Sequence, residues 1–389
     1  MSISPIAATM QLQHLTLQNF RNYARGDVRL RSQTVVFHGA NGAGKTSLLE
    51  AICLAATGYS PRAREMGEMV RTGGDHAFVR AHFRRAEGAE ATLETGLARN
   101  GTRQIKVNGV VRRRADLIGV APVVYFSADD LGVIKGEPSA RRRLIDRELS
   151  AISRTYYFHW QRYQRAIEQR NRLLKDLRAR RRGGDGLEPW DRSAARYGAR
   201  VMLERHAFIQ LLARESERAH AVLTGGARRL FVEYLPAVAL PNGQSGGDWE
   251  KDRDALAEEL TSSLTAALRA RREGDIAQGV TGCGPHRDDL GLRLGEQALR
   301  EFGSQGEQRA CAASIRIGLA STVEHITGAS PVVLLDDVLS ELDARYREGV
   351  FAASQQAEQV IVTSCDLADI PAGVRGESQI FEVVDGRVA

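Results

Sequence analysis

Hydrophobic and polar residues alternate near the start of the chain and then give way to a short apolar run. Residues 12–20, LQHLTLQNF, alternate with the period of a half-buried strand. The run TVVFH at 34–38 has the composition of a buried strand and leads into glycine. We therefore predict two strands between residues 12 and 40, followed by a helix over residues 47–58.

Residues 78–126 are rich in strand-forming residues, with turn signals between them. Arg99-Asn100-Gly101 and Asn108-Gly109 have the composition of β-hairpin turns. The stretch ends in the apolar segment VAPVVYF at 120–126. We predict a β-rich subdomain here, which completes one α/β lobe with the segments before it.

Apolar residues then recur at alternating spacings of four and three, which is the period of an amphipathic helix. The first stripe, which Arg170 interrupts, consists of Tyr156, Trp160, Tyr163, Ile167, Leu174 and Leu177. After the breaker RRGGDGLEPW (181–190), the second stripe, which Glu204 interrupts, consists of Tyr197, Val201, Phe208 and Leu211. We predict an antiparallel helix hairpin with the aromatic side chains in its core, not around a cofactor.

The glycine-rich polar stretch at 241–252 is predicted to be a linker, followed by a helix over 254–272. After Gly279 strand and helix patterns alternate again. These patterns predict an α/β head with an inserted helical lobe. We divide the chain into 1–145, the N-terminal part of the head; 146–270, the helical lobe; and 271–389, the C-terminal part of the head.

Composition narrows the class of protein. The 389 residues suffice for two or three domains, and the four cysteines form no C-x-x-C pair, which indicates thiols in a reducing compartment and a cytoplasmic protein. No run reaches the about 18 apolar residues of a membrane span, and residues 1–10 lack the features of an export signal. We expect those ten residues to be a loose extension.

Positive charge is concentrated in one segment. The net charge is +6, but residues 141–182 hold fourteen Lys or Arg against four acidic residues, an excess of ten. Two interpretations stay open: a solvated basic helix face, or contact with a phosphate backbone. The candidate DNA-binding residues are Arg162, Arg165, Arg172, Arg178 and Arg180. No base-reading motif and no cluster of metal-ligating residues typical of a nuclease is visible in the sequence.

The strongest motif lies between the run TVVFH and the helix that follows. It matches the P-loop pattern and consists of Gly39, Ala40, Asn41, Gly42, Ala43, Gly44, Lys45 and Thr46. Glycines let successive backbone N–H groups surround phosphate, and the helix N-terminus adds its dipole. We expect ATP here, with Lys45 on the β and γ phosphates and Thr46 on Mg²⁺.

Two further motifs lie near the C-terminus. PVVLLDDVLSELD (331–343) predicts a buried strand that ends in Asp336, a candidate Mg²⁺ ligand, and Asp337, placed to orient or deprotonate a water molecule. Upstream, Ser304 and Glu307 have the spacing of a capping box at the start of a helix.

The order of these motifs resembles the signature, Walker B and D-loop series of ABC ATPases. Within that superfamily, the strings LQNFRNY (17–23), YFSADDLGVIKGEPSARRRLID (125–146) and TGCGPHRDDL (281–290) resemble the bacterial RecF family. The resemblance covers nearly the whole chain and is weakest at 183–265.

This resemblance implies an ABC-type ATPase head that closes as an ATP-sandwiched homodimer. The signature residues Ser304, Gly306 and Glu307 would face the nucleotide of the partner subunit. Arg21 and Asn22 would lie near the nucleotide of their own subunit, and residues 128–130 would form the Q-loop region. The implied function is DNA repair and replication restart at gapped or single-stranded DNA, within the SOS response. In this role the protein would act with RecO and RecR to help load the recombinase.

Departures from the general ABC pattern predict slow ATP hydrolysis, and with the RecF resemblance we expect a weak, DNA-dependent ATPase. Asp337 is one methylene shorter than the glutamate often found there, and Thr363 and Ser364 stand where a switch histidine is expected. For residues 284–289, Gly-Pro-His-Arg-Asp-Asp, the alternative to an unassigned family role is a tight turn with a hydrogen-bonded His286 and an Arg–Asp pair.

Two other function classes share part of the pattern. The nucleotide-binding subunit of a transporter would have the same motifs but a membrane partner, and the long basic insertion argues against it. A chromosome-organising protein of the SMC type would need a much longer heptad arm than residues 156–211 provide.

Overall fold

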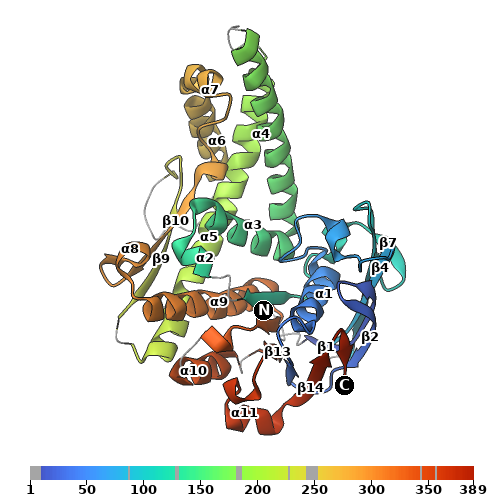
Figure 1. Ribbon diagram of the computed structural model, residues 1–389. Helices are drawn as coiled ribbons and strands as arrows, with labels where there is room; N and C mark the ends of the chain where they lie inside the picture. Colours follow the sequence, from blue (N-terminus) through green and yellow to red (C-terminus); the bar gives the residue numbers. More distant parts are fainter. Residues whose placement is uncertain are drawn as a thin grey trace, which may run out of the picture. The chain divides into compact units, whose positions relative to one another are not determined.

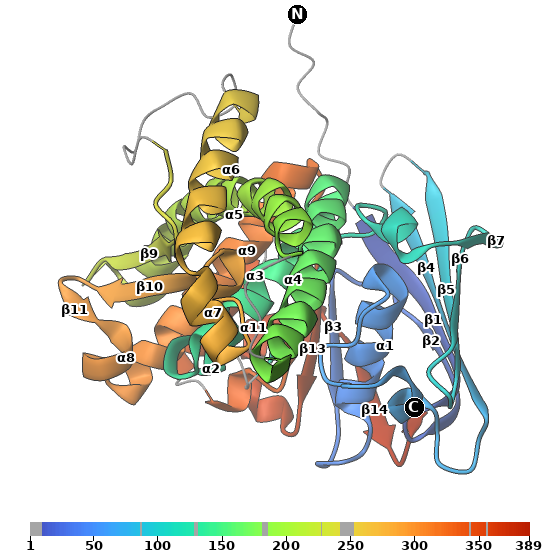
Figure 2. The same ribbon diagram turned by 90° about the horizontal axis from the view of Figure 1, so that it is seen from above.

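The computed structural model describes residues 10–85, 88–127, 131–180, 186–226, 228–241, 253–341, 344–354 and 357–389. The chain forms two compact units (Figures 1 and 2). We call residues 1–134, 214–230 and 294–389 the head unit, and residues 135–213 and 231–293 the helical unit.

The head unit contains a six-stranded sheet that draws on both ends of the chain. Its order is β15-β14-β3-β13-β12-β8. The strands are β3 (Thr34–His38), β8 (Val123–Ser127), β12 (Val332–Asp336), β13 (Gln359–Ser364), β14 (Gln379–Val384) and β15 (Arg387–Val388). β3 pairs in parallel with β13, with Val36 opposite Val362. The prediction of an α/β head interrupted by an insertion is therefore confirmed.

A second, antiparallel sheet of the head unit has the order β2-β1-β4-β5-β6-β7. Its strands are β1 (Met10–Phe20), β2 (Tyr23–Arg29), β4 (His76–Arg85), β5 (Glu90–Ala98), β6 (Arg103–Val107) and β7 (Val110–Arg112). Asn108 and Gly109 join β6 to β7 with φ of 51° and 78°, so both residues of this hairpin turn have the positive φ that such turns require. The predicted β-rich subdomain is confirmed.

The prediction of two strands between residues 12 and 40 was wrong, because β2 forms a third. β2 is an edge strand that pairs with β1. Only Tyr23 and Val28 are buried in it, and exposed polar residues occupy much of the remainder. The hydrophobic alternation that indicates a strand is therefore too weak to be recognised.

Helix α1 (Lys45–Thr57) begins directly after the P-loop, as predicted, and contacts strands of both sheets. Leu48, Ile52 and Leu54 are fully buried in one core with residues of both sheets. This burial fixes the position of the helix N-terminus.

The other helices of the head unit include α8 (Leu299–Phe302), α9 (Gln305–Thr327), α10 (Ala344–Ser354) and α11 (Ala372–Glu377). Short 3-10 turns are η1 (Met66–Met69), η2 (Arg114–Leu117), η5 (Leu339–Glu341) and η6 (Leu367–Asp369). Strand β11 (Gln297–Ala298) precedes α8, and α2 (Leu131–Lys135) follows β8.

The helical unit is built around the predicted helix hairpin. It contains α3 (Pro138–Ile152), α4 (Arg154–Arg180), α6 (Arg253–Ala270), α7 (Arg272–Gln278), η4 (Pro285–Arg287), most of β9 (Leu230–Leu235) and β10 (Asp289–Leu294), and residues 188–213 of α5 (Glu188–Thr224). α4 and α5 run antiparallel, since Tyr163 packs against Gly198 whereas Arg170, further along α4, pairs with the earlier residue Asp191. The antiparallel hairpin is confirmed.

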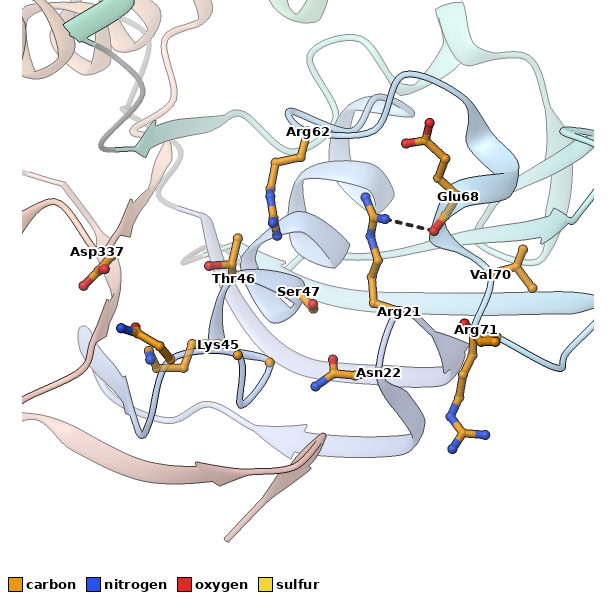
Figure 3. A pocket seen from close by; sticks show the side chains of 14 residues that line it. Arg21, Asn22, Lys45, Thr46, Ser47, Arg62, Glu68, Val70, Arg71 and Asp337 are labelled. Atoms are coloured by element: carbon orange, nitrogen blue, oxygen red, sulfur yellow. Dashed lines mark hydrogen bonds between the residues drawn. The ribbon is translucent and has the colours of Figure 1, made fainter.

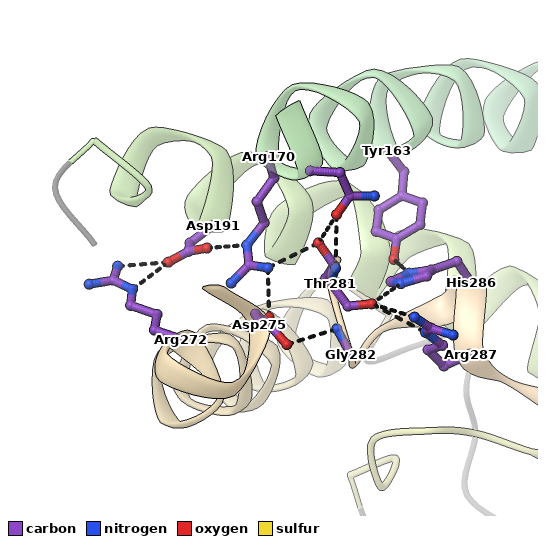
Figure 4. Close-up of polar contacts among 10 residues, drawn as sticks. Tyr163, Arg170, Asp191, Arg272, Asp275, Thr281, Gly282, His286 and Arg287 are labelled. Atoms are coloured by element: carbon purple, nitrogen blue, oxygen red, sulfur yellow. Dashed lines mark hydrogen bonds and ion pairs between the residues drawn. The ribbon is translucent and has the colours of Figure 1, made fainter. Parts of the chain in front are cut away.

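The residue that interrupts the first apolar stripe, Arg170, lies fully buried in a polar network (Figure 4). Its guanidinium donates to the carboxylates of Asp191, at 2.6 Å, and Asp275, at 2.7 Å. A third bond of 2.9 Å reaches the hydroxyl of Thr281. A buried cation requires such partners, and the network joins α4, α5 and α7.

A second buried arginine, Arg205 of α5, joins the segment at 284–289 to the helices of the helical unit. It pairs with Asp146 and Asp288 at 2.7 and 2.9 Å, and Arg141 pairs with Asp289 at 2.6 Å. The compact units therefore differ from the predicted division. Residues 271–293 belong with the helices because of these ion pairs, and the predicted boundary at 145/146 falls inside α3.

The predicted tight turn is η4. The ring of His286 in it is hydrogen-bonded at both nitrogens: Nδ1 lies 2.5 Å from the Tyr163 hydroxyl, and Nε2 lies 2.9 Å from the carbonyl oxygen of Thr281 (Figure 4). Because a carbonyl only accepts, Nε2 carries the proton and Nδ1 accepts from tyrosine. Burial lowers the pKa of His286 to about 4.

No helix in the described ranges is long and apolar enough to cross a membrane. The four cysteines, all of which are described, form no disulfide; Cys365 is exposed, and the other three are buried.

The buried neutral state of His286 predicts an acid dependence of stability. Its pKa is about 4 when folded and about 6.5 when unfolded. The stabilisation is therefore complete above about pH 6.5 and is lost as the pH falls toward 4, by about 3 kcal/mol in all. In denaturant unfolding, the free energy of unfolding of His286→Asn should fall less between about pH 6.5 and pH 4 than that of the wild type. His76→Asn, at an exposed position, serves as the control, and an equal change of slope in both variants would contradict the assignment.

Candidate functional site

The P-loop has a backbone conformation that two of its glycines make possible. Gly39 and Gly44 have φ of 153° and 118°. A Cβ at Gly39 would lie 2.2 Å from the carbonyl oxygen of Val383, and one at Gly44 would lie 2.6 Å from the amide nitrogen of Asn22. Both glycines are therefore required by close approach within the chain as well as by φ.

The loop borders a cavity of about 660 Å³ in the head unit. Figure 3 shows Asp337 at one side of it and Val70 and Arg71 at the other, with Thr46 between them. The lining residues are Arg21, Asn22, Asn41, Gly42, Gly44, Lys45, Thr46, Ser47, Arg62, Glu68, Val70, Arg71, Thr72 and Asp337. Asp337 and five of the predicted P-loop residues thus line one cavity, whereas Gly39, Ala40 and Ala43 are not among its lining residues.

Lys45 is buried and held by the loop itself. Its ammonium donates to the carbonyl oxygens of Gly39, at 2.6 Å, and Ala40, at 3.0 Å. The thiol sulfur of Cys365 lies 3.4 Å from Nζ. The loop itself therefore positions this positive charge at the cavity.

Asp336, the last residue of β12, accepts three hydrogen bonds from hydroxyl groups. Thr46 and Thr363 donate to Oδ1, both at 2.8 Å, and Tyr125 donates to Oδ2 at 2.5 Å. Burial and the adjacent carboxylate raise the pKa of Tyr125 above its usual range, so the phenol stays a donor. Tyr125 and Thr363 are partners that the sequence motif did not reveal, because they come from neighbouring strands.

Asp337 leaves the strand in a left-handed conformation, with φ of 53°. Its N–H donates to the hydroxyl of Thr363 at 2.9 Å. Burial raises the pKa of its carboxyl group; the positive charge of Lys45 opposes the rise, and the nearby Asp336 adds to it. A carboxylate with a raised pKa is a better proton acceptor than an ordinary aspartate.

Arg21 and Asn22 form the wall beside the P-loop. Arg21 binds the fully buried Glu50 through two bonds of 2.8 and 2.7 Å, and donates to the carbonyl of Glu68 at 2.9 Å. Asn22 donates to the carbonyl of Ala43 at 2.9 Å. Sequence reasoning missed Arg62, Arg71 and Thr72, which line the cavity from segments without a recognised motif.

The predicted capping box at the start of α9 is present. Glu307 donates its N–H to the Ser304 hydroxyl at 3.3 Å, and the Glu307 carboxylate accepts from the Ser304 N–H at 2.9 Å. Arg228 binds the same carboxylate at 2.9 Å. None of these residues, nor Gly306, is among the residues that line the cavity.

The remaining candidate residues lie elsewhere. Arg162, Arg165, Arg172 and Arg178 are exposed on α4 in the helical unit. Residues 128–130 of the predicted Q-loop region, residues 342–343 of the predicted D-loop, the side chain of Arg180 and most of the predicted linker lie outside the described part of the chain.

Comparisons with known proteins identify the family. The family model described as the RecF/RecN/SMC N terminal domain matches residues 11–374. The DNA replication and repair protein RecF of Lachnospira eligens is 33% identical over 382 residues, which cover 97% of this chain and 99% of the relative. The chain belongs to the RecF family. Membership in the RecF family confirms the resemblance. It argues against the two alternatives, a transporter subunit and a chromosome-organising protein of the SMC type.

Two solved structures extend the RecF match to three dimensions. Both are of the recombination mediator protein RecF in the RecFOR pathway, one with ATPrS and one with ATP. Each is 28% identical to this chain in sequence, and each match covers 98% of this chain and 99% of the solved one. The TM-scores are 0.87 and 0.83. The RecF fold therefore extends over both units of the chain.

The buried carboxylate of Glu50 makes Arg21 a stabilising residue of the wall. Arg21→Ala leaves this carboxylate without its cationic partner and is expected to lower the free energy of unfolding by about 3 kcal/mol. Arg62→Ala, the control, replaces an exposed arginine of the same cavity and should change it by less than about 0.5 kcal/mol. Denaturant unfolding measures both, and equal losses would contradict the role of the Arg21–Glu50 pair.

Proposed function

We propose that this chain is an ATP-binding protein of recombinational DNA repair and replication restart that closes as an ATP-sandwiched homodimer on DNA. One observation carries the proposal: the P-loop, Lys45 and Asp337 meet at a single cavity of the head unit. Membership in the RecF family, together with solved RecF structures that hold ATP or ATPrS, supports ATP as the ligand.

The residues around the cavity fit the triphosphate and its metal ion. P-loop N–H groups and the N-terminus of α1 favour an anion. Lys45 exchanges its two carbonyl partners for phosphate oxygens. The Thr46 hydroxyl and the Asp336 carboxylate lie 2.8 Å apart and are oxygen ligands of the kind that Mg²⁺ prefers. When bound there, Mg²⁺ neutralises phosphate charge.

Hydrolysis depends on Asp337 in this proposal. Its carboxylate orients or deprotonates the attacking water, and its raised pKa suits a proton acceptor. The short side chain and Thr363, which hydrogen-bonds Asp336 and the Asp337 N–H in place of a switch histidine, favour slow turnover. We therefore assign a weak, DNA-dependent ATPase.

The place of the signature residues supports the proposed dimer. Ser304, Gly306 and Glu307 lie apart from the cavity of their own subunit. A Cβ at Gly306 would meet no atom within 4 Å, so packing within this chain does not require that glycine. A second subunit whose nucleotide approaches the N-terminus of α9 would require it.

DNA is the proposed polyanionic partner, bound at gapped or single-stranded junctions by Arg162, Arg165, Arg172, Arg178 and Arg180. We also propose RecO and RecR as partners, within the SOS response, from family membership. The decisive experiment is binding to gapped, single-stranded and duplex oligonucleotides with and without ATP. Absence of binding to all of them would overturn the proposal.

Asp337→Asn is expected to keep ATP binding and to slow hydrolysis by about 100-fold or more, because the amide is a poor proton acceptor. Nucleotide titration and single-turnover hydrolysis measure the two effects separately. Lys45→Ala is the matched comparison and should lose ATP affinity itself. If Asp337→Asn hydrolyses ATP at the wild-type rate, Asp337 has no part in the reaction.

Ser304→Arg is expected to abolish ATP-dependent dimerisation and to leave ATP binding to its own P-loop intact. The arginine side chain is larger than serine and positively charged, so it opposes the helix dipole and occupies the place of the partner's γ-phosphate. Ser304→Ala, the control, removes only the cap hydroxyl, at about 1 kcal/mol, and should still dimerise at saturating ATP. Light scattering with ATP and Mg²⁺ measures the mass, and an arginine variant that still doubles in mass rules out the sandwich.

A further inference from the structure

The outer face of α4 in the helical unit combines one exposed aromatic ring with several arginines. Phe158 is 47% exposed. At 3.6 residues per turn it shares this face with Arg154, Arg162, Arg165 and Arg172, all of them exposed. About half of the Phe158 side chain therefore stays accessible to a ligand, beside positive charge.

These arginines differ from a second group of arginines in the helical unit, which bind carboxylates. Arg141, Arg170, Arg205 and Arg272 each bind a carboxylate. In the described parts of the chain, no ion pair involves the four arginines of the α4 face. Their charge is therefore free to act on a ligand.

A second aromatic residue extends the face onto α5. The ring of Tyr197 meets Phe158 edge to face, with 6.3 Å between the ring centroids. The guanidinium of Arg162 lies 4.9 Å from the Phe158 centroid, and that of Arg196 lies 5.9 Å from the Tyr197 centroid. Each ring thus has its own arginine beside it.

The electrostatic surroundings agree with a positively charged surface. After burial, the charges of Arg200 and Arg196 are the largest causes that lower the pKa of His159, whose ring contacts both aromatic rings. Arg200 itself is paired with Asp254 at 2.7 Å, so Arg196 is the one of these two whose charge no ion pair in the described parts of the chain offsets.

We propose that Phe158 and Tyr197, with Arg162 and Arg196 beside them, form a stacking platform for the unpaired bases of single-stranded DNA. This inference rests on the proposed DNA-binding function and names the part of the DNA that this surface binds. Bases stack on exposed aromatic rings irrespective of sequence, and arginines hold the phosphates between them.

Arginines alone would bind duplex and single strand alike, because both present phosphates. An aromatic ring is useful only where a base face is accessible, and in a duplex each base face is covered by its neighbours. The combination therefore favours single-stranded DNA over duplex. A purely apolar protein partner would not explain the unpaired arginines.

The test compares a labelled single-stranded oligonucleotide with a duplex of the same length, by fluorescence anisotropy over a range of salt concentrations. Phe158→Ala should weaken single-strand binding about tenfold, with duplex binding and both salt slopes unchanged. Phe158→Trp should restore the affinity, and its indole fluorescence should be quenched by the single strand. Phe231→Ala is the matched control, because Phe231 also has an arginine, Arg293, over its ring.

The outcomes separate this inference from the proposed function. If wild-type protein binds neither DNA, the proposed function itself fails. If it binds DNA and Phe158→Ala loses no single-strand affinity, or loses duplex affinity equally, the stacking platform is wrong. A simultaneous loss in Phe231→Ala would also overturn the platform. Replacing Arg162, Arg165 and Arg172 together by glutamine should flatten the salt slope for both DNAs.

Discussion

The head unit depends on one buried carboxylate. Asp336 ends strand β12 and receives hydroxyl donors from α1, β8 and β13 through Thr46, Tyr125 and Thr363. A buried carboxylate is costly without such donors, so these three segments are held where the carboxylate needs them. The two ends of the chain, far apart in sequence, are joined at this point of the parallel sheet.

The geometry of the nucleotide cavity follows from that anchor. Because β12 ends at Asp336, the backbone turns at Asp337 into a left-handed conformation that Thr363 supports. The carboxyl group of Asp337 then lies close enough to Lys45 for the two charges to interact. The same hydroxyl of Thr363 bonds both to Asp336 and to the backbone of Asp337, so the proposed metal ligand and the proposed catalytic base are positioned together.

The helical unit uses one residue type in two opposite ways. Arg170 and Arg205 are buried and bind carboxylates, which fixes the helices and the turn at 284–289. Arg162 and Arg165 lie exposed on the outer face, and no ion pair within the described ranges involves them. Buried pairs add specificity to the packing, and unpaired surface charges are available to a polyanion.

The sequence by itself determined the P-loop, the strand that ends in two aspartates, the capping box and the helix hairpin, because each depends on local spacing and periodicity. It did not reveal the edge strand β2, where few side chains are buried. Nor did it separate the paired arginines from the unpaired ones, or show that Tyr125 and Thr363 serve Asp336. Those facts depend on contacts between segments distant in sequence, and only the tertiary structure decides which side chains meet.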